Sequence, residues 1–207
     1  LQPLFQARQL AIVHACGSPD TTRSHFDAQD YMETATPGVK STTDGWLNRY
    51  LHAREHEAAT PFRAVAPAPQ LPRSLQGTAP ALAIGQIDRF GIRGGRSGEM
   101  VQSSFESEYA AAADRVLNTT SRDAFSAIRM LKEADLQRYT PANGAEYPAS
   151  GYGLALKQIA QLVKADLGLE IAFAESGNWD HHANEGAATG QLANRLDDHA
   201  RGIAALA

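Results

Sequence analysis

The fold of this chain is constrained most by a short apolar run that leads directly into a polar segment. Residues 169–174 lie between Gly168 and Gly177 and predict a short buried strand. The next segment, residues 176–184, carries one carboxylate, two imidazoles and amide side chains, and an amphipathic helical pattern begins at about Gly186. Strand, polar loop and helix in this order are typical of α/β folds, in which ligands bind at the carboxyl ends of the strands.

Asp180 and His182 make this polar loop a candidate metal site. They stand two residues apart, so in an extended segment their side chains point to the same side, as two ligands of one ion must. Two ligands are a short signature, however. The same residues also suit a polar surface loop whose Trp179 packs into the core, and the spacing alone leaves both interpretations open.

A second strand-to-helix junction lies near the beginning of the chain. Residues 10–15 are apolar apart from His14 and predict a central parallel strand, buried on both faces, with His14 as a core histidine. Turn-forming residues follow at 16–20. Thr22 or Ser24 then provides the N-cap of a helix.

The amino end of this predicted helix is a candidate anion site. Arg23, Ser24 and His25 stand where free backbone N–H groups and the helix dipole favour negative charge. A hydroxyl group there can act as a nucleophile, and Arg23 can hold an oxyanion of the phosphate or sulfate type. A side chain that only caps the helix is the simpler interpretation of the same pattern.

Further apolar patterns complete the predicted fold. Residues 81–84 predict another short buried strand, whereas residues 58–80, rich in Pro and Ala, predict an irregular crossing. Helical spacing predicts helices over residues 45–57, 101–116, 124–131 with a cap at Thr120 or Ser121, 156–167, and from about 186 onwards. The expected buried face of the last helix consists of Leu192, Leu196, Ala200 and Ile203. Residues 85–98, rich in Gly and Arg, predict a basic surface loop or a lid over an anionic substrate.

Composition excludes several functional classes. A net charge of −4 and a pI near 6.0 give no basic surface for nucleic acid or an anionic membrane. Apolar runs stay far below membrane-spanning length, so we expect neither a nucleic-acid partner nor membrane insertion. The single Cys16 excludes an internal disulfide framework. Leu1 is not an initiator Met and the last helical pattern has no stop signal, so we expect a partial chain.

Five segments together resemble domain-of-unknown-function family 1501, a bacterial family in the alkaline-phosphatase/sulfatase superfamily. They are Val-His-Ala-Cys-Gly-Ser-Pro (13–19), Arg-Ser-His-Phe-Asp-Ala-Gln (23–29), Asp-Gly-Trp-Leu-Asn-Arg (44–49), Ala-Leu-Ala-Ile-Gly (81–85) and Gly-Asn-Trp-Asp-His-His-Ala-Asn (177–184). The segments follow the family's order through most of the chain. The family usually has Gly-Gly-Trp-Asp-Thr-His at the last of them. Here Asn178 and His181 depart from that pattern, whereas Asp180 and His182 keep the presumed ligand positions.

The resemblance implies a three-layer α/β/α fold with a mostly parallel sheet, of which residues 1–207 form a single partial domain, incomplete at both ends. It implies export to the periplasm and hydrolysis of phosphate or sulfate esters at a centre of divalent metal ions such as zinc or calcium. Asp180 and His182 would then be metal ligands, Ser24 and His25 would lie on the side of the nucleophile, and Arg23 would contact the oxyanion.

The partner implied by the resemblance is a small anionic ester or a glycan, and no oligomeric state follows from it. Full-length family members carry further Asp- and His-containing segments that this chain does not contain. If those segments supply the remaining ligands, this polypeptide alone is inactive. The alternative function is a non-catalytic envelope protein that uses the same scaffold to bind a glycan or another protein.

Overall fold

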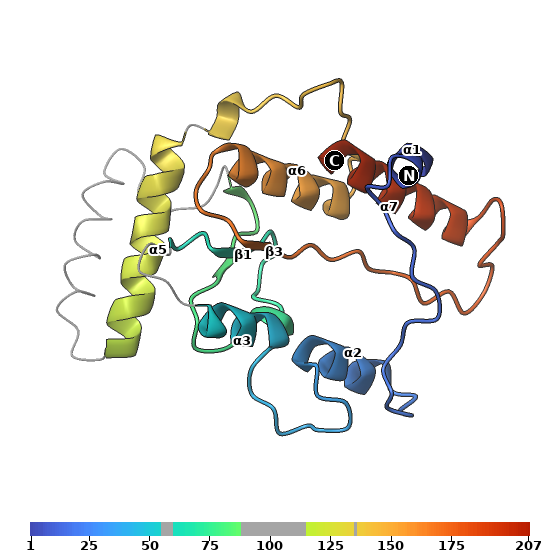
Figure 1. The fold of residues 1–207 in the computed structure, drawn as a ribbon, viewed down its shortest axis with the longest axis horizontal. Coiled ribbons are helices and arrows are strands. Elements are labelled where there is room, and N and C mark those ends of the chain that lie inside the picture. Colours follow the sequence, from blue (N-terminus) through green and yellow to red (C-terminus); the bar gives the residue numbers. More distant parts are fainter. Residues whose placement is uncertain (55–59, 88–114, 135) are drawn as a thin grey trace. The chain divides into compact units, whose positions relative to one another are not determined.

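The computed structural model describes residues 1–54, 60–87, 115–134 and 136–207 (Figure 1). Its helices are α1 (Gln2–Gln6), α2 (His25–Thr34), α3 (Trp46–Ala53), α5 (Arg115–Glu133), α6 (Gly151–Lys164) and α7 (Gln191–Leu206). The short 3-10 helices are η1 (Arg73–Leu75) and η4 (Leu136–Arg138). The strands are β1 (Ala64–Ala66), β2 (Leu82–Ala83) and β3 (Ile171–Ala172).

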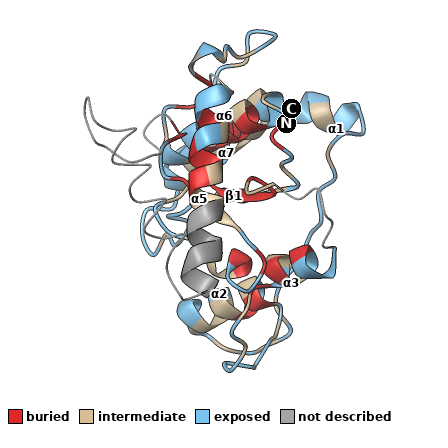
Figure 2. Cartoon of the chain, turned by 90° about the vertical axis from the view of Figure 1, so that its left-hand side faces the viewer, coloured by how far each residue is buried: buried red, intermediate tan, exposed pale blue. Residues whose placement is uncertain are grey.

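The strands form a parallel sheet in the order β2-β1-β3, which confirms a mixed α/β fold. Val65 pairs with Leu82 on one side and with Ala172 on the other, so β1 is the central strand. All three residues of β1 are fully buried, as is typical of a strand covered on both faces (Figure 2). The three-layer arrangement stays a prediction.

Two strands were predicted where the structure has them, and two other expectations were wrong. β2 and β3 lie inside the apolar runs 81–84 and 169–174, although each is only two residues long. The central strand β1 lies inside the segment predicted to be irregular. Residues 10–15 form no strand, and their Ile12 and Val13 are 62% and 74% exposed. An apolar run becomes a strand only where another strand pairs with it, and these residues have no such partner among the described strands.

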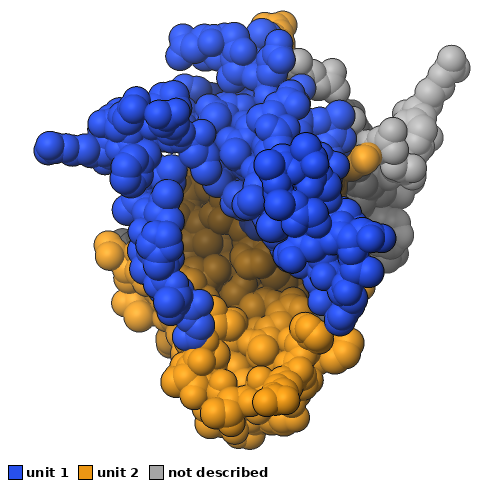
Figure 3. Space-filling model, turned by 90° about the vertical axis from the view of Figure 1, so that its right-hand side faces the viewer, with its two compact units in different colours: residues 1–17, 139–164, 174–207 blue, residues 18–138, 165–173 orange. Residues whose placement is uncertain are grey.

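The chain divides into two compact units, shown in different colours in Figure 3. Unit 1 consists of residues 1–17, 139–164 and 174–207, and contains α1, α6 and α7. Unit 2 consists of residues 18–138 and 165–173, and contains the whole sheet with α2, α3 and α5.

The core of unit 2 is built around β1 and α3. Leu51 of α3 and Leu75 of η1 pack with the β1 alanines, and Ile171 and Phe173 flank this cluster. The opposite side of α3 is exposed at Trp46. The helix predicted over this segment is confirmed.

Asn48 is a buried polar side chain that fixes the segment after η1. Its Nδ2 donates to the carbonyl oxygens of Leu75 and Ala79, each at 2.8 Å, and its Oδ1 accepts from the backbone N–H of Ala79 at 3.0 Å. Gly77 lies directly over it with φ 153°, and a Cβ at Gly77 would come within 2.2 Å of Asn48 Oδ1. One amide side chain thus replaces the regular backbone pairing that this irregular segment lacks.

Arg63, immediately before β1, is a second buried polar side chain of unit 2. Its Nε donates to Glu170 Oε1 at 2.8 Å, and its Nη1 donates to the carbonyl oxygen of Leu51, also at 2.8 Å. Its Nη2 donates to the carbonyl oxygen of Arg54. The guanidinium group therefore satisfies carbonyl groups at the end of α3 and joins that end to the start of β3.

The bounds and buried faces of two helices differ from the prediction. α5 is continuous through Thr120 and Ser121, which were expected to cap a new helix. α7 begins at Gln191 rather than near 186, and Leu196, expected on its buried face, is 52% exposed. Gly202 is instead buried against α6, where the lack of a Cβ leaves room for the side chains of Leu156 and Tyr152. Within the described residues, none of the helices is both long and apolar enough to cross a membrane.

Candidate functional site

Asp180 and His182 lie on an exposed loop of unit 1 that follows β3. His182 Nε2 is 2.8 Å from Asp180 Oδ2, and the two side chains are 78% and 58% exposed. The predicted convergence of these alternate side chains is therefore present. Trp179 does not pack into a core: it is exposed, and its Nε1 donates to the carbonyl oxygen of Ser176 at 2.7 Å. The segment is a polar surface loop, as the alternative interpretation had it, but its expected packing of Trp179 into the core was wrong.

The spacing of the two side chains suits a shared divalent ion. In a tetrahedral zinc site with metal–ligand distances near 2.0–2.2 Å, a nitrogen and an oxygen ligand stand roughly 3.3 Å apart. The Asp180–His182 pair needs to open by about half an ångström to reach that distance. Among the described residues, no group of three or more Asp, Glu, His or Cys side chains is placed to hold a metal ion. Asp180 and His182 thus bring two potential donors together, and a metal centre at this loop stays a prediction.

Arg23, Ser24 and His25 stand together at the start of α2 in unit 2. Ser24 is the N-cap of α2, and its Oγ accepts from the backbone N–H of Asp27 at 3.3 Å, which confirms the predicted cap. The Ser24 hydroxyl proton takes no part in this bond and can still be donated. The side chains of Arg23 and His25 are exposed.

A series of short-range hydrogen bonds shapes the segment that leads into this helix. Ser18 Oγ accepts from the N–H of Asp20, Asp20 Oδ1 from that of Thr22, and Thr22 Oγ1 from that of Ser24. Side chains of this kind replace backbone pairing in turns. They hold the chain in a defined path as far as the N-cap, so the position of Ser24 is set locally.

The electrostatic environment of this helix end is mixed. Asp27 lies in the first turn, where the helix dipole favours a carboxylate, and Lys40 Nζ contacts it at 2.9 Å. The hydrogen bond and charge of Asp27 raise the pKa of Lys40, so Lys40 stays protonated at neutral pH. Arg23, which contacts no described acidic side chain at salt-bridge distance, is the cation available for an external anion.

The candidate residues fall into different units. Asp180 and His182 belong to unit 1, whereas Arg23, Ser24 and His25 belong to unit 2. Each group is defined within its own unit, and their convergence on one pocket stays a prediction. Most of the predicted basic loop, residues 88–98, lies outside the described residues.

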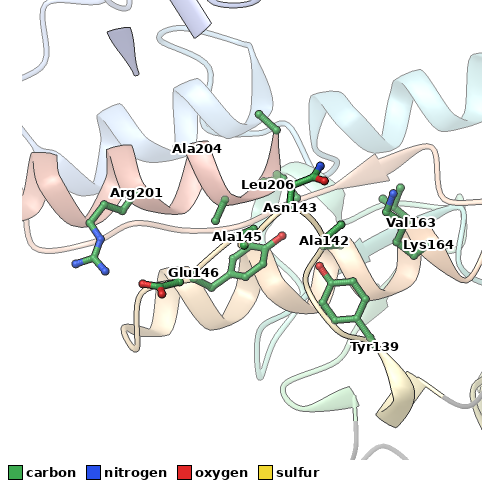
Figure 4. A pocket seen from close by; sticks show the side chains of 15 residues that line it. Tyr139, Ala142, Asn143, Ala145, Glu146, Val163, Lys164, Arg201, Ala204 and Leu206 are labelled. Atoms are coloured by element: carbon green, nitrogen blue, oxygen red, sulfur yellow. The ribbon is translucent and has the colours of Figure 1, made fainter. Parts of the chain in front are cut away.

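Unit 1 also contains a cavity that the sequence did not indicate (Figure 4). It has a volume of about 560 Å³ and lies between the 139–147 loop and the carboxyl ends of α6 and α7. Tyr139 and Tyr147 lie on its wall and are hydrogen-bonded to each other; burial and this bond raise the pKa of Tyr147. None of the five candidate site residues lines the cavity.

Comparison with known proteins gives no match. No protein-family model matches the chain, and no curated protein or solved structure is significantly similar to it. The family resemblance therefore rests on the five sequence motifs.

Proposed function

We propose that this chain belongs to an exported, metal-dependent hydrolase of phosphate or sulfate esters with an alkaline-phosphatase-like three-layer fold. The observation that carries the proposal is the 2.8 Å approach of Asp180 Oδ2 and His182 Nε2 on an exposed loop that follows a parallel strand. The helix-capping Ser24 beside Arg23 and the five motifs of family 1501 support it further.

The proposed chemistry assigns a separate role to each group. Asp180 and His182 bind a divalent ion, which neutralises the ester oxygens and lowers the pKa of the attacking group. Ser24 provides the nucleophilic hydroxyl, and the exposed His25 is the adjacent group for proton transfer. Arg23 holds a non-bridging oxygen of the ester through its planar guanidinium group. The substrate is accordingly a small anionic ester, free or on a glycan.

Metal binding is the first expected result, measured on the complete gene product by calorimetric titration with zinc and with calcium. His182→Ala should weaken binding of the preferred ion by at least about tenfold, because it removes one of the converging donors. Asp180→Asn should weaken it as well, since a neutral amide oxygen is a poorer ligand than a carboxylate.

His14→Ala is the matched control for this titration, because His14 is an exposed histidine in another segment of unit 1. It should leave affinity unchanged. Equal metal affinity for the wild-type, His182→Ala and Asp180→Asn proteins would remove these residues from the metal site. Metal binding without hydrolysis of any phosphate or sulfate ester would favour the non-catalytic envelope scaffold.

The two roles of Ser24 separate in a pair of substitutions. Ser24→Ala should cost about 1 kcal/mol of stability through loss of the N-cap. Ser24→Asn keeps a capping oxygen and should be nearly as stable as the wild type, but it has no nucleophilic hydroxyl. Urea unfolding and hydrolysis of aryl phosphate and aryl sulfate esters are measured for both. Full activity in Ser24→Asn would assign Ser24 a capping role only.

A further inference from the structure

The loop that carries Asp180 and His182 depends on side chains for its position. It contains neither helix nor strand, and its backbone takes left-handed conformations at Asn178 (φ 63°) and Asn184 (φ 54°), on either side of the pair. Near Asp180, the Trp179 side chain donates from Nε1 to the Ser176 carbonyl oxygen, and the His181 N–H donates to the Trp179 carbonyl oxygen. These bonds are local to the loop. After the pair, Gln191 Nε2 at the start of α7 donates to the carbonyl oxygens of Ala183 and Asn184, at 3.2 and 3.3 Å.

The ring of Trp179 attaches the loop to α7 on the other side of the pair, before Asp180. It meets the His199 ring edge-on, with 5.9 Å between ring centroids and an interplanar angle of 82°. His199 in turn stacks on Tyr152 of α6, with centroids 4.8 Å apart and planes 16° from parallel. Edge-on and stacked ring pairs at these separations are stabilising. We call Trp179, His199 and Tyr152 the aromatic anchor.

Tyr152 is held firmly enough to support this arrangement. Gly202, one turn after His199, leaves the space that Tyr152 occupies, since a Cβ there would lie 3.0 Å from Tyr152 Cε1. Burial, and then the charge of Asp198, raise the pKa of Tyr152, so its phenol is neutral at physiological pH. The Tyr152 ring therefore adds no charge of its own to the stack.

His199 is held by ring contacts rather than by hydrogen bonding at its Nδ1. That nitrogen is buried and has no hydrogen-bond partner among the described residues. A flat apolar ring of similar size should therefore make the same contacts with Trp179 and Tyr152. Phenylalanine meets that requirement and alanine does not.

We propose that Trp179 and His199 are positioning residues of the metal site, which fix the Asp180–His182 pair to α6 and α7. The proposal rests on the proposed function for the metal itself. Trp179 directly precedes Asp180, so the side of the loop on which Asp180 and His182 project follows from where the Trp179 ring is seated. Groups that orient metal ligands in this way typically change metal affinity by roughly 10–100-fold when they are removed.

The experiment uses the complete gene product with Trp46→Phe as the parent. The chain has two tryptophans, and Trp46 lies in unit 2, so this change leaves Trp179 as the fluorophore of these residues. Any tryptophan in flanking sequence is also replaced. His199→Ala, His199→Phe and Leu196→Ala are compared for zinc affinity, Trp179 emission and thermal midpoint. Leu196 is the control, because it lies on α7 one turn before His199 and is exposed.

His199→Ala is expected to shift Trp179 emission to longer wavelength before any metal is added, because the ring loses its cover, and to weaken zinc binding about tenfold. His199→Phe should restore both properties, and Leu196→Ala should change neither. Unchanged emission and affinity in His199→Ala, or equal damage in His199→Phe, would overturn the proposal.

The emission of the metal-free variants separates this proposal from the proposed function. If the parent does not bind zinc but His199→Ala still shifts the emission, the anchor exists and the metal assignment fails. If the parent binds zinc and His199→Ala behaves like the parent, the metal assignment holds and the positioning role fails.

Discussion

Replacing Asn48 by alanine is expected to destabilise unit 2 by about 3–5 kcal/mol, because it leaves three buried backbone groups without their partner. These are the carbonyl oxygens of Leu75 and Ala79 and the N–H of Ala79. Water cannot easily replace the amide, since Asn48 is almost fully buried. Urea unfolding followed by far-ultraviolet circular dichroism measures the loss.

Asn194→Ala provides the control for this prediction. Asn194 is also in a helix but is exposed, and its side chain makes no hydrogen bond to another described residue. The gain in helix propensity is the same in both variants, so their difference isolates the buried hydrogen bonds. Similar unfolding curves for Asn48→Ala and Asn194→Ala would show that the segment after η1 does not depend on this side chain.

Arg63→Met is expected to cost about 3–4 kcal/mol in the same measurement. The substitution keeps most of the apolar volume but removes the guanidinium donors to Glu170 and to the carbonyl oxygens of Leu51 and Arg54. The Leu51 carbonyl oxygen loses a buried hydrogen bond but keeps the one from the Arg54 N–H, and the Arg54 carbonyl oxygen loses a half-buried one. Glu170 is 32% exposed and can regain water, which limits the loss.

Arg49→Met is the matched control for Arg63. Arg49 also donates to backbone carbonyl groups and to a carboxylate, here those of Asp44 and Thr34, but its side chain is 39% exposed. Its loss should cost no more than about 1 kcal/mol. If Arg49→Met were as damaging as Arg63→Met, burial would not be what makes Arg63 important.

Local signals in the sequence were sufficient for some elements of the fold. The cap at Ser24 depends on a residue three positions away, and the short strands β2 and β3 coincide with apolar runs between turn residues. Such features are decided within a few residues. Their predicted type was correct and only their lengths changed.

Elements that depend on distant partners could not be predicted in this way. β1 is three residues long and lies among prolines and alanines, so its central place follows only from pairing with β2 and β3. Residues 10–15 show the reverse, because their composition suits a strand but nothing in it supplies a neighbour. On α7, Gly202 rather than Leu196 decides which face packs, since close approach depends on what α6 presents.

The candidate site also has features that were predictable from local sequence and features that were not. The convergence of Asp180 and His182 follows from a spacing of two residues and was predictable. The ring contact of Trp179 with His199 was not predictable, because it joins a residue of the loop to one on α7 and no local pattern links the two. Buried Arg63 and Asn48 carried no signal either, since a polar residue in a sequence ordinarily indicates a surface.

The hydrogen bond between Arg63 and Glu170 joins residues 107 positions apart, and Thr60 Oγ1 reaches the Leu167 carbonyl oxygen across the same separation. Closing a loop of that length costs about 4 kcal/mol of chain entropy. During synthesis on the ribosome, the central strand must therefore wait for more than a hundred further residues before its second neighbour arrives. The nascent chain therefore passes through a long interval in which one edge of its central strand has no partner.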